Sequence, residues 1–144
     1  MHQKELFMRY FLSIILPYLL CFISAEEFHY TAGFRLFDAG EAIFTSNEGT
    51  FNGKKAMEFT SRINTNSFLS KFYRVDDVVS IWANREDFTL IQIDKKIREG
   101  NYKLDYSARV SEDFRLVTEK SSIQLESKVY DPVSVIFMLR AQPL

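Results

Sequence analysis

The chain has 144 residues, with 18 basic and 19 acidic side chains, 47% hydrophobic and 15% aromatic residues, one cysteine and two histidines. A single cysteine excludes a disulfide scaffold, and there are too few cysteines and histidines for a zinc ribbon. The balanced charge argues against a nucleic-acid-binding protein, and the many aromatic residues argue against a disordered chain. The length fits one domain.

Residues 1–25 have the pattern of a secretory signal peptide. A start containing two basic residues precedes an apolar run over residues 10–23, and Ser24 and Ala25 supply the small residues of a cleavage site. The apolar run is shorter than the roughly 20 residues that a spanning helix needs. We therefore expect cleavage after Ala25 and no transmembrane anchor thereafter. An uncleaved N-terminal anchor and a lipoprotein attached at Cys21 are the alternatives.

Residues 26–144 are predicted to form a single β-rich domain. Cleavage would remove the only cysteine, so the exported protein would contain neither a disulfide nor a thiol. The chain has no proline between Glu26 and Asp131. A proline-free stretch of this length is compatible with successive strands, because proline cannot donate a hydrogen bond to a β-ladder.

Alternation of apolar and polar residues is the main evidence for strands. It is clearest from Tyr102 to Val110, where every second residue is apolar or aromatic and the residues between are polar. The same pattern predicts strands over residues 56–63, 114–118 and 123–129, each with one solvated face. Strands that are apolar on both faces are predicted over residues 28–37, 42–45, 68–75, 78–83 and 88–93.

Turn-forming residues separate these segments at intervals of about 8 to 12 residues. Because no helix lies between the strands, a parallel arrangement is disfavoured. The predicted fold is mainly β, an antiparallel meander that forms a curved sheet or a partial barrel. Turns are predicted at residues 38–40, 47–49, 52–53, 76–77, 84–85, 99–101 and 111–113.

One helix is predicted, over residues 131–141. Asp131 can cap its N-terminus, and Pro132 suits the first helical position. The residues from Val133 to Leu139 are almost all apolar, so we expect the helix to pack on the sheet. A final buried strand is the alternative interpretation.

The residues available for chemistry point away from an enzyme. His29 is the only histidine after cleavage, and its strand-like surroundings favour an exposed side chain over a catalytic base. The pair at residues 76–77 lacks the spacing of a calcium loop, and the glycines do not form a phosphate-binding loop. A small basic cluster is interpreted as a hairpin edge whose charges discourage aggregation, rather than as a ligand site. It consists of Lys95, Lys96 and Arg98. We predict no catalytic, cofactor-binding or metal-binding residues.

The 14 phenylalanines are the one unusual feature of the composition. A β domain without disulfides needs large side chains in its core, because each buried Phe stabilises the fold by about 1.5–3 kcal/mol. This is the favoured interpretation. The alternative is an apolar cavity for a lipid-like ligand.

Four segments follow one another along the chain: YTAGFRLFDAGEA (residues 30–42), FYRVDDVVSIW (72–82), IREGNYKLDYSARV (97–110) and YDPVSVIFMLRAQPL (130–144). Taken in this order, they resemble a bacterial exported family known as domain of unknown function 3108. The resemblance implies a sheet-rich periplasmic or envelope-associated protein with no assigned reaction. By motif position, the family-like residues are Gly40, Glu41, Asp131, Pro132, Ser134 and Arg140.

The resemblance implies further strands beyond the predicted helix, so we expect this chain to be truncated at its C-terminal end. A natural short form and a partner that supplies the remaining strands are the alternatives. The expected function is that of an exported cell-envelope protein, a non-enzymatic scaffold or interaction module that binds another envelope protein. A carrier of an apolar, lipid-like envelope ligand is the alternative. No nucleic-acid partner is expected.

Overall fold

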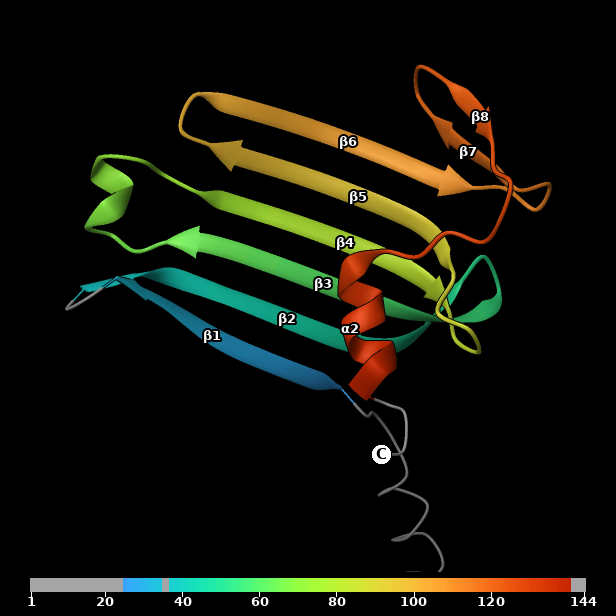
Figure 1. Ribbon diagram of the computed structural model, residues 1–144, viewed down its shortest axis with the longest axis horizontal. Helices are drawn as coiled ribbons and strands as arrows, with labels where there is room; N and C mark the ends of the chain where they lie inside the picture. Colours follow the sequence, from blue (N-terminus) through green and yellow to red (C-terminus); the bar gives the residue numbers. More distant parts are fainter. Residues whose placement is uncertain (1–24, 35–36, 141–144) are drawn as a thin grey trace, which may run out of the picture.

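The computed structural model describes residues 25–34 and 37–140, which form one eight-stranded antiparallel sheet with a helix on one face (Figure 1). Except for Ala25, the predicted signal peptide lies outside the described residues. Within them, no helix is long and apolar enough to cross a membrane. The elements are β1 (Glu26–Phe34), β2 (Phe37–Phe51), β3 (Lys54–Thr65), the 3-10 helix η1 (Leu69–Lys71), β4 (Asp76–Asn84), β5 (Leu90–Glu99), β6 (Tyr102–Val110), β7 (Arg115–Thr118), β8 (Ser122–Gln124) and α2 (Pro132–Arg140).

Each strand pairs only with its neighbours in sequence, in the order β1 to β8. All the pairings are antiparallel, so the predicted antiparallel meander is confirmed. Since β1 and β8 lie at opposite edges, the sheet is open and does not close into a barrel.

Tight two-residue turns join two of the longest hairpins. Asn52 and Gly53 both have positive φ, 50° and 79°, as a type I′ turn between β2 and β3 requires. Gly100, with φ 56°, begins the turn between β5 and β6. A turn predicted at residues 47–49 is wrong, because β2 continues through it to the Asn52–Gly53 turn.

The predicted turns at residues 38–40 and 76–77 are also wrong, since both lie in strands. The predicted strand over residues 68–75 is wrong as well, because this segment contains η1. Asn66 explains the difference: its Oδ1 accepts hydrogen bonds from the backbone N–H groups of Phe68 and Leu69, which favours a turn over a strand.

The predicted strand over residues 123–129 is much shorter in the structure, where β8 ends at Gln124. Beyond β8 the chain crosses back over the sheet toward α2. Along this path the carbonyl of Val129 accepts a hydrogen bond from the N–H of Leu90, at 2.8 Å. The segment therefore contacts β5 while connecting β8 to the helix.

The predicted helix is confirmed over Pro132–Arg140, and residue 141 lies outside the described residues. Asp131 caps it, because its Oδ1 accepts the N–H of Val133 at 2.8 Å. Phe137 is only 4% exposed and packs against Phe59, with ring centroids 5.0 Å apart. The helix thus covers part of one sheet face, and the hydrophobic core lies between them.

Candidate interaction surface

Side chains on the face that carries α2 form rows across the sheet, because the strands pair residue to residue. One such row contains Ser46, Phe59, Ile81, Ile93 and Ala108, which face one another from β2 to β6. None of these residues is more than 6% exposed. We call this the covered row, and it forms the centre of the core.

A second row lies four residues farther along each strand, which is about 13 Å away. Its aromatic and aliphatic members are not part of the buried core cluster. Two of them are exposed to solvent, Tyr30 (54%) and Ile63 (43%), and the other apolar members are half-buried. We call it the open row. It consists of Tyr30, Ala42, Ile63, Asp77, Ile97 and Leu104, one from each of β1 to β6.

The length and position of α2 explain why the helix does not reach the open row. Nine helical residues span only about 14 Å. Phe137 lies over the covered row, and the Arg140 guanidinium lies 4.2 Å from the centroid of the Phe28 ring. Figure 1 shows the helix crossing one end of β2 to β4 and leaving the other end bare.

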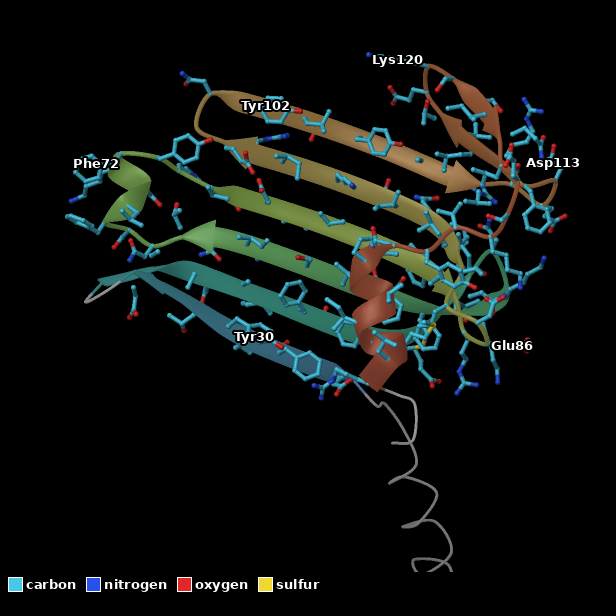
Figure 2. The ribbon with its side chains drawn as sticks, viewed as in Figure 1. Tyr30, Phe72, Glu86, Tyr102, Asp113 and Lys120 are labelled. Atoms are coloured by element: carbon cyan, nitrogen blue, oxygen red, sulfur yellow. The ribbon has the colours of Figure 1, made fainter. Side chains whose placement is uncertain are left out.

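Further exposed aromatic residues lie at the end of the sheet that is away from α2. Tyr102 is 55% exposed, and Phe72 is 77% exposed in the segment that follows η1. Figure 2 shows both side chains at the end away from α2. Phe68 and Phe72 contact each other edge to face, with centroids 5.6 Å apart. Exposed large apolar side chains that gather on one surface mark sites that bind other molecules.

Asp77 is the one acidic residue of the open row, and its carboxylate has a structural partner. The side chain is buried, and its Oδ1 accepts the backbone N–H of Arg98 at 2.8 Å. This bond joins the start of β4 to β5. Asp77 is therefore already satisfied within the fold, and the exposed part of the row is aromatic and aliphatic.

The larger cavities lie elsewhere. One of about 530 Å³ lies at the β6 edge, where β4, β5 and β6 meet the start of the β7–β8 turn, and most of its lining residues are on the opposite face. Another of about 540 Å³ lies at the end of β3 and includes Arg62, Arg74, Glu41 and Asp76. Both contain charges of both signs, and most of their lining residues lie on the face opposite α2.

The residues considered as catalytic or ligand-binding candidates lie far apart or form surface pairs with a neighbouring carboxylate. His29 is exposed and contacts Glu27 on the same strand. Lys95 points to the face that carries α2, whereas Arg98 on the other face binds both carboxylate oxygens of Asp105, at 2.7 and 2.9 Å. Among the described residues, no three His, Cys, Asp or Glu side chains group as a metal site would require.

One ion pair has shifted pKa values. Partial burial raises the pKa of Asp87, but hydrogen bonds from Lys128 and Thr89 outweigh it, so the pKa lies below the usual value. The same carboxylate raises the pKa of Lys128. The pair connects the β4–β5 loop to the segment before α2, with Nζ and Oδ2 2.6 Å apart. Its position indicates a role in attaching that segment.

The family-like residues at the helix contribute to its attachment. Pro132 occupies the first helical position, and the buried Ser134 hydroxyl donates to the Asp131 carbonyl at 2.8 Å. Arg140, in the last turn, pairs with Glu26 of β1 at 3.2 Å. A cation is favoured at this end of a helix. Pro132 and Ser134 therefore stabilise the start of α2, and Arg140 attaches its end to the first strand.

The other two family-like residues lie in β2. A turn was expected at Gly40, but the residue is in the strand, and a Cβ there would overlap the Asn64 carbonyl oxygen of β3. Glycine is required by this close approach of two backbones. Glu41 accepts a hydrogen bond from the Asn64 side chain at 3.2 Å.

A family model described as "Protein of unknown function (DUF3108)" matches residues 29–144. The chain belongs to this family. The predicted resemblance is thus confirmed over most of the chain. No curated protein and no solved structure matches it.

The open row has no separate signal in the sequence. Ile63 and Phe59 occupy equivalent positions in the alternation of β3, yet one is exposed and the other completely buried. Only the position of α2 distinguishes them. The large number of aromatic residues was the one sequence feature that pointed toward an apolar surface.

Proposed function

We propose that this DUF3108 protein is a non-enzymatic interaction module of the bacterial cell envelope, and that it binds another polypeptide across the open row. The observation that carries the proposal is the incomplete cover of one apolar sheet face. Tyr30, Ile63 and Tyr102 expose large apolar side chains on the same face. Covering them would remove this surface from water, which is the main driving force of association.

A carrier of an apolar envelope ligand remains the alternative, and the same exposed surface would serve it. Small-molecule sites are usually enclosed, burying at least 70–90% of a ligand of about drug size. The open row instead lies on the surface of an open sheet. This geometry favours a partner that brings its own extended surface, and therefore a protein.

Photo-crosslinking in living cells tests the proposal. A photoreactive phenylalanine analogue replaces Ile63 in one variant and Arg62 in the other. These neighbours on β3 point to opposite faces, and both are exposed, so the second variant is a matched control. We expect a discrete protein adduct from position 63 and none from position 62.

Mass spectrometry of the adduct separates the candidates. A polypeptide attached at position 63 supports the interaction module, and an attached lipid supports the carrier and overturns our proposal. Equal labelling from both positions, or no adduct from either, contradicts a binding role for the open row.

Export is tested separately, because the proposed location follows from the signal-like sequence of residues 1–25. Cell fractionation and N-terminal sequencing of the purified protein measure it. We expect a periplasmic or envelope-associated protein that begins at Glu26. A cytoplasmic protein with an intact N-terminus would contradict the envelope location.

A further inference from the structure

Strand β6 has a free edge over most of its length. It pairs with β5 from Tyr102 to Arg109, whereas β7 covers its other edge only from Ala108 to Val110. At Thr118 the chain turns back, and the Thr118 N–H bonds to the carbonyl of Ser121. Figure 1 shows the β7–β8 hairpin rising away from β6. The edge formed by residues 102–107 is therefore unpaired among the described residues.

The direction of the backbone groups along this edge follows from the pairing. Ser111, just beyond β6, donates its N–H toward the Arg115 carbonyl on the β7 side. Alternate residues of an antiparallel strand direct their backbone groups to the same side. Lys103, Asp105 and Ser107 therefore direct their N–H and C=O groups away from β5, toward the free edge.

The cavity of about 530 Å³ adjoins the same edge. Four consecutive residues of β6, from Leu104 to Ser107, line it, together with residues 118–120 at the start of the β7–β8 turn. Its floor includes Ser80 of β4 and Asp94 of β5, on the face opposite α2. An unpaired edge and a cavity thus coincide where β7 leaves β6. Lys120 marks the turn in Figure 2.

We infer that the free edge of β6 binds an extended peptide segment of a partner protein, which adds to the sheet as an antiparallel strand. The inference rests on the proposed function in one respect, namely that the partner is a polypeptide. In this kind of recognition the main-chain hydrogen bonds provide affinity, and alternate side chains provide specificity. A strand of six residues, about 20 Å long, matches the edge.

Side chains of β6 define the chemistry of the peptide. On the face that carries α2, Tyr102, Leu104 and Tyr106 require apolar partners opposite them. On the cavity face, Lys103 forms no ion pair with a described residue and suits an acidic partner. Asp105 is bound by Arg98, but its side chain is 72% exposed, so its carboxylate can accept a second, basic partner.

A second copy of the chain is a poorer occupant of this edge. Pairing Lys103 with Asp105 of the copy would match the charges. That register, however, places the Gly100–Asn101 turn of the copy opposite Ser107 and Ala108. Thr118 of β7 already occupies the position opposite Ala108. The steric conflict favours a single peptide strand that ends where β7 begins.

A set of synthetic peptides tests the inference, with protein purified from cells that express the whole chain. The probe is a blocked hexapeptide, Thr-Ile-Lys-Val-Glu-Tyr, designed to run antiparallel to residues 107 to 102. We expect saturable binding, measured by NMR, with the largest amide shifts at Lys103, Asp105 and Ser107. Exchanging Lys and Glu in the peptide should weaken binding about fivefold to tenfold, because two attractive cross-strand pairs become repulsive.

N-methylated peptides then test the main-chain hydrogen bonds between the peptide and β6. Methyl groups on the backbone nitrogens of Lys and Glu block the hydrogen bonds to β6 and should abolish binding. Methyl groups on those of Ile and Val point away from β6 and should leave most of the binding. If both peptides bind equally well, the peptide does not add as a strand and the inference is wrong.

Two matched variants of Ser107 test the same hydrogen bonds by changing the protein instead of the peptide. Ser107→Pro removes an N–H that faces the free edge, whereas Ser107→Ala retains it. Both leave the Arg98–Asp105 pair in place. We expect the first to abolish peptide binding and the second to leave it unchanged, with equal circular dichroism spectra showing that both fold. Binding by Ser107→Pro would overturn the inference, whereas the crosslink from position 63 would still test the open row.

Discussion

The two halves of the helix-bearing sheet face have similar side chains but different surroundings. In the covered row, aromatic and aliphatic residues are sealed by Phe137 of α2. In the open row, four residues away on each strand, Tyr30 and Ile63 are exposed and the other apolar side chains are only half-buried. The difference shows that residues with one periodic pattern can support stability at one end of a sheet and remain available for binding at the other.

The largest expected effect comes from a matched pair of isoleucines, one in each row. Ile81→Ala leaves a cavity in the core and should lower the free energy of unfolding by about 2–5 kcal/mol. Ile63→Ala removes a 43% exposed side chain and should cost less than about 1 kcal/mol. Urea denaturation measures both. Equal losses would show that the open row is buried in solution.

Gly40→Ala tests whether a substitution near the open row can also destabilise the protein. The added Cβ would overlap the Asn64 carbonyl oxygen, so β2 and β3 must separate. We expect a loss of about 1–3 kcal/mol in the free energy of unfolding, as for other overpacked sites. Denaturation of Gly49→Ala is a comparison, because its new Cβ would meet only the movable Trp82 side chain. A neutral Gly40→Ala would show that the strands are not held this closely.

Asp131 stabilises the start of α2, the helix that covers the core. Asp131→Ala removes the acceptor for the Val133 N–H and should destabilise the protein by about 0.5–2 kcal/mol. Asp131→Asn keeps a capping oxygen and should remain within a few tenths of a kcal/mol. Thermal unfolding compares the two variants. If both variants lose the same stability, the helix requires the negative charge of Asp131 and not its capping hydrogen bond.

The smallest expected effect concerns the Asp87–Lys128 pair near the covered half. The folded pKa of Asp87 lies below its unfolded value, so its contribution is present above the unfolded pKa of about 3.9 and is lost as the pH falls through the folded pKa. At neutral pH, Asp87→Asn should cost less than about 1 kcal/mol, because the group is partly exposed. The difference between wild type and variant should disappear once the pH is below the folded pKa of Asp87. A constant difference would contradict this linkage.

Alternation predicted the strands best where one face is apolar and the other solvated, as from Tyr102 to Val110. The helix was predicted because Asp131 and Pro132 form a local start signal that acts within one turn. Turn predictions failed where polar residues have partners in adjacent strands. Asp77, for example, accepts a backbone N–H from β5 and so belongs to a strand.

The candidate surfaces could not be predicted from the sequence, because they depend on where the neighbouring elements α2 and β7 end. The open row exists because α2 ends over Phe28, and the free edge of β6 exists because the chain turns back at Thr118. Neither position follows from the composition of the exposed strands. The sheet-rich fold, by contrast, could be predicted because it depends on local patterns.

The attachment of α2 to β1 has a consequence for how the chain acquires its structure. Every sheet pairing joins neighbours in sequence, so strands can be added one by one, with short loops to close and little delay. The Arg140–Glu26 pair instead joins residues 114 positions apart. We therefore expect the sheet to assemble early and the docking of the helix to be the late, slow event. During the interval the core would be as exposed as the open row, and aggregation would be the principal risk.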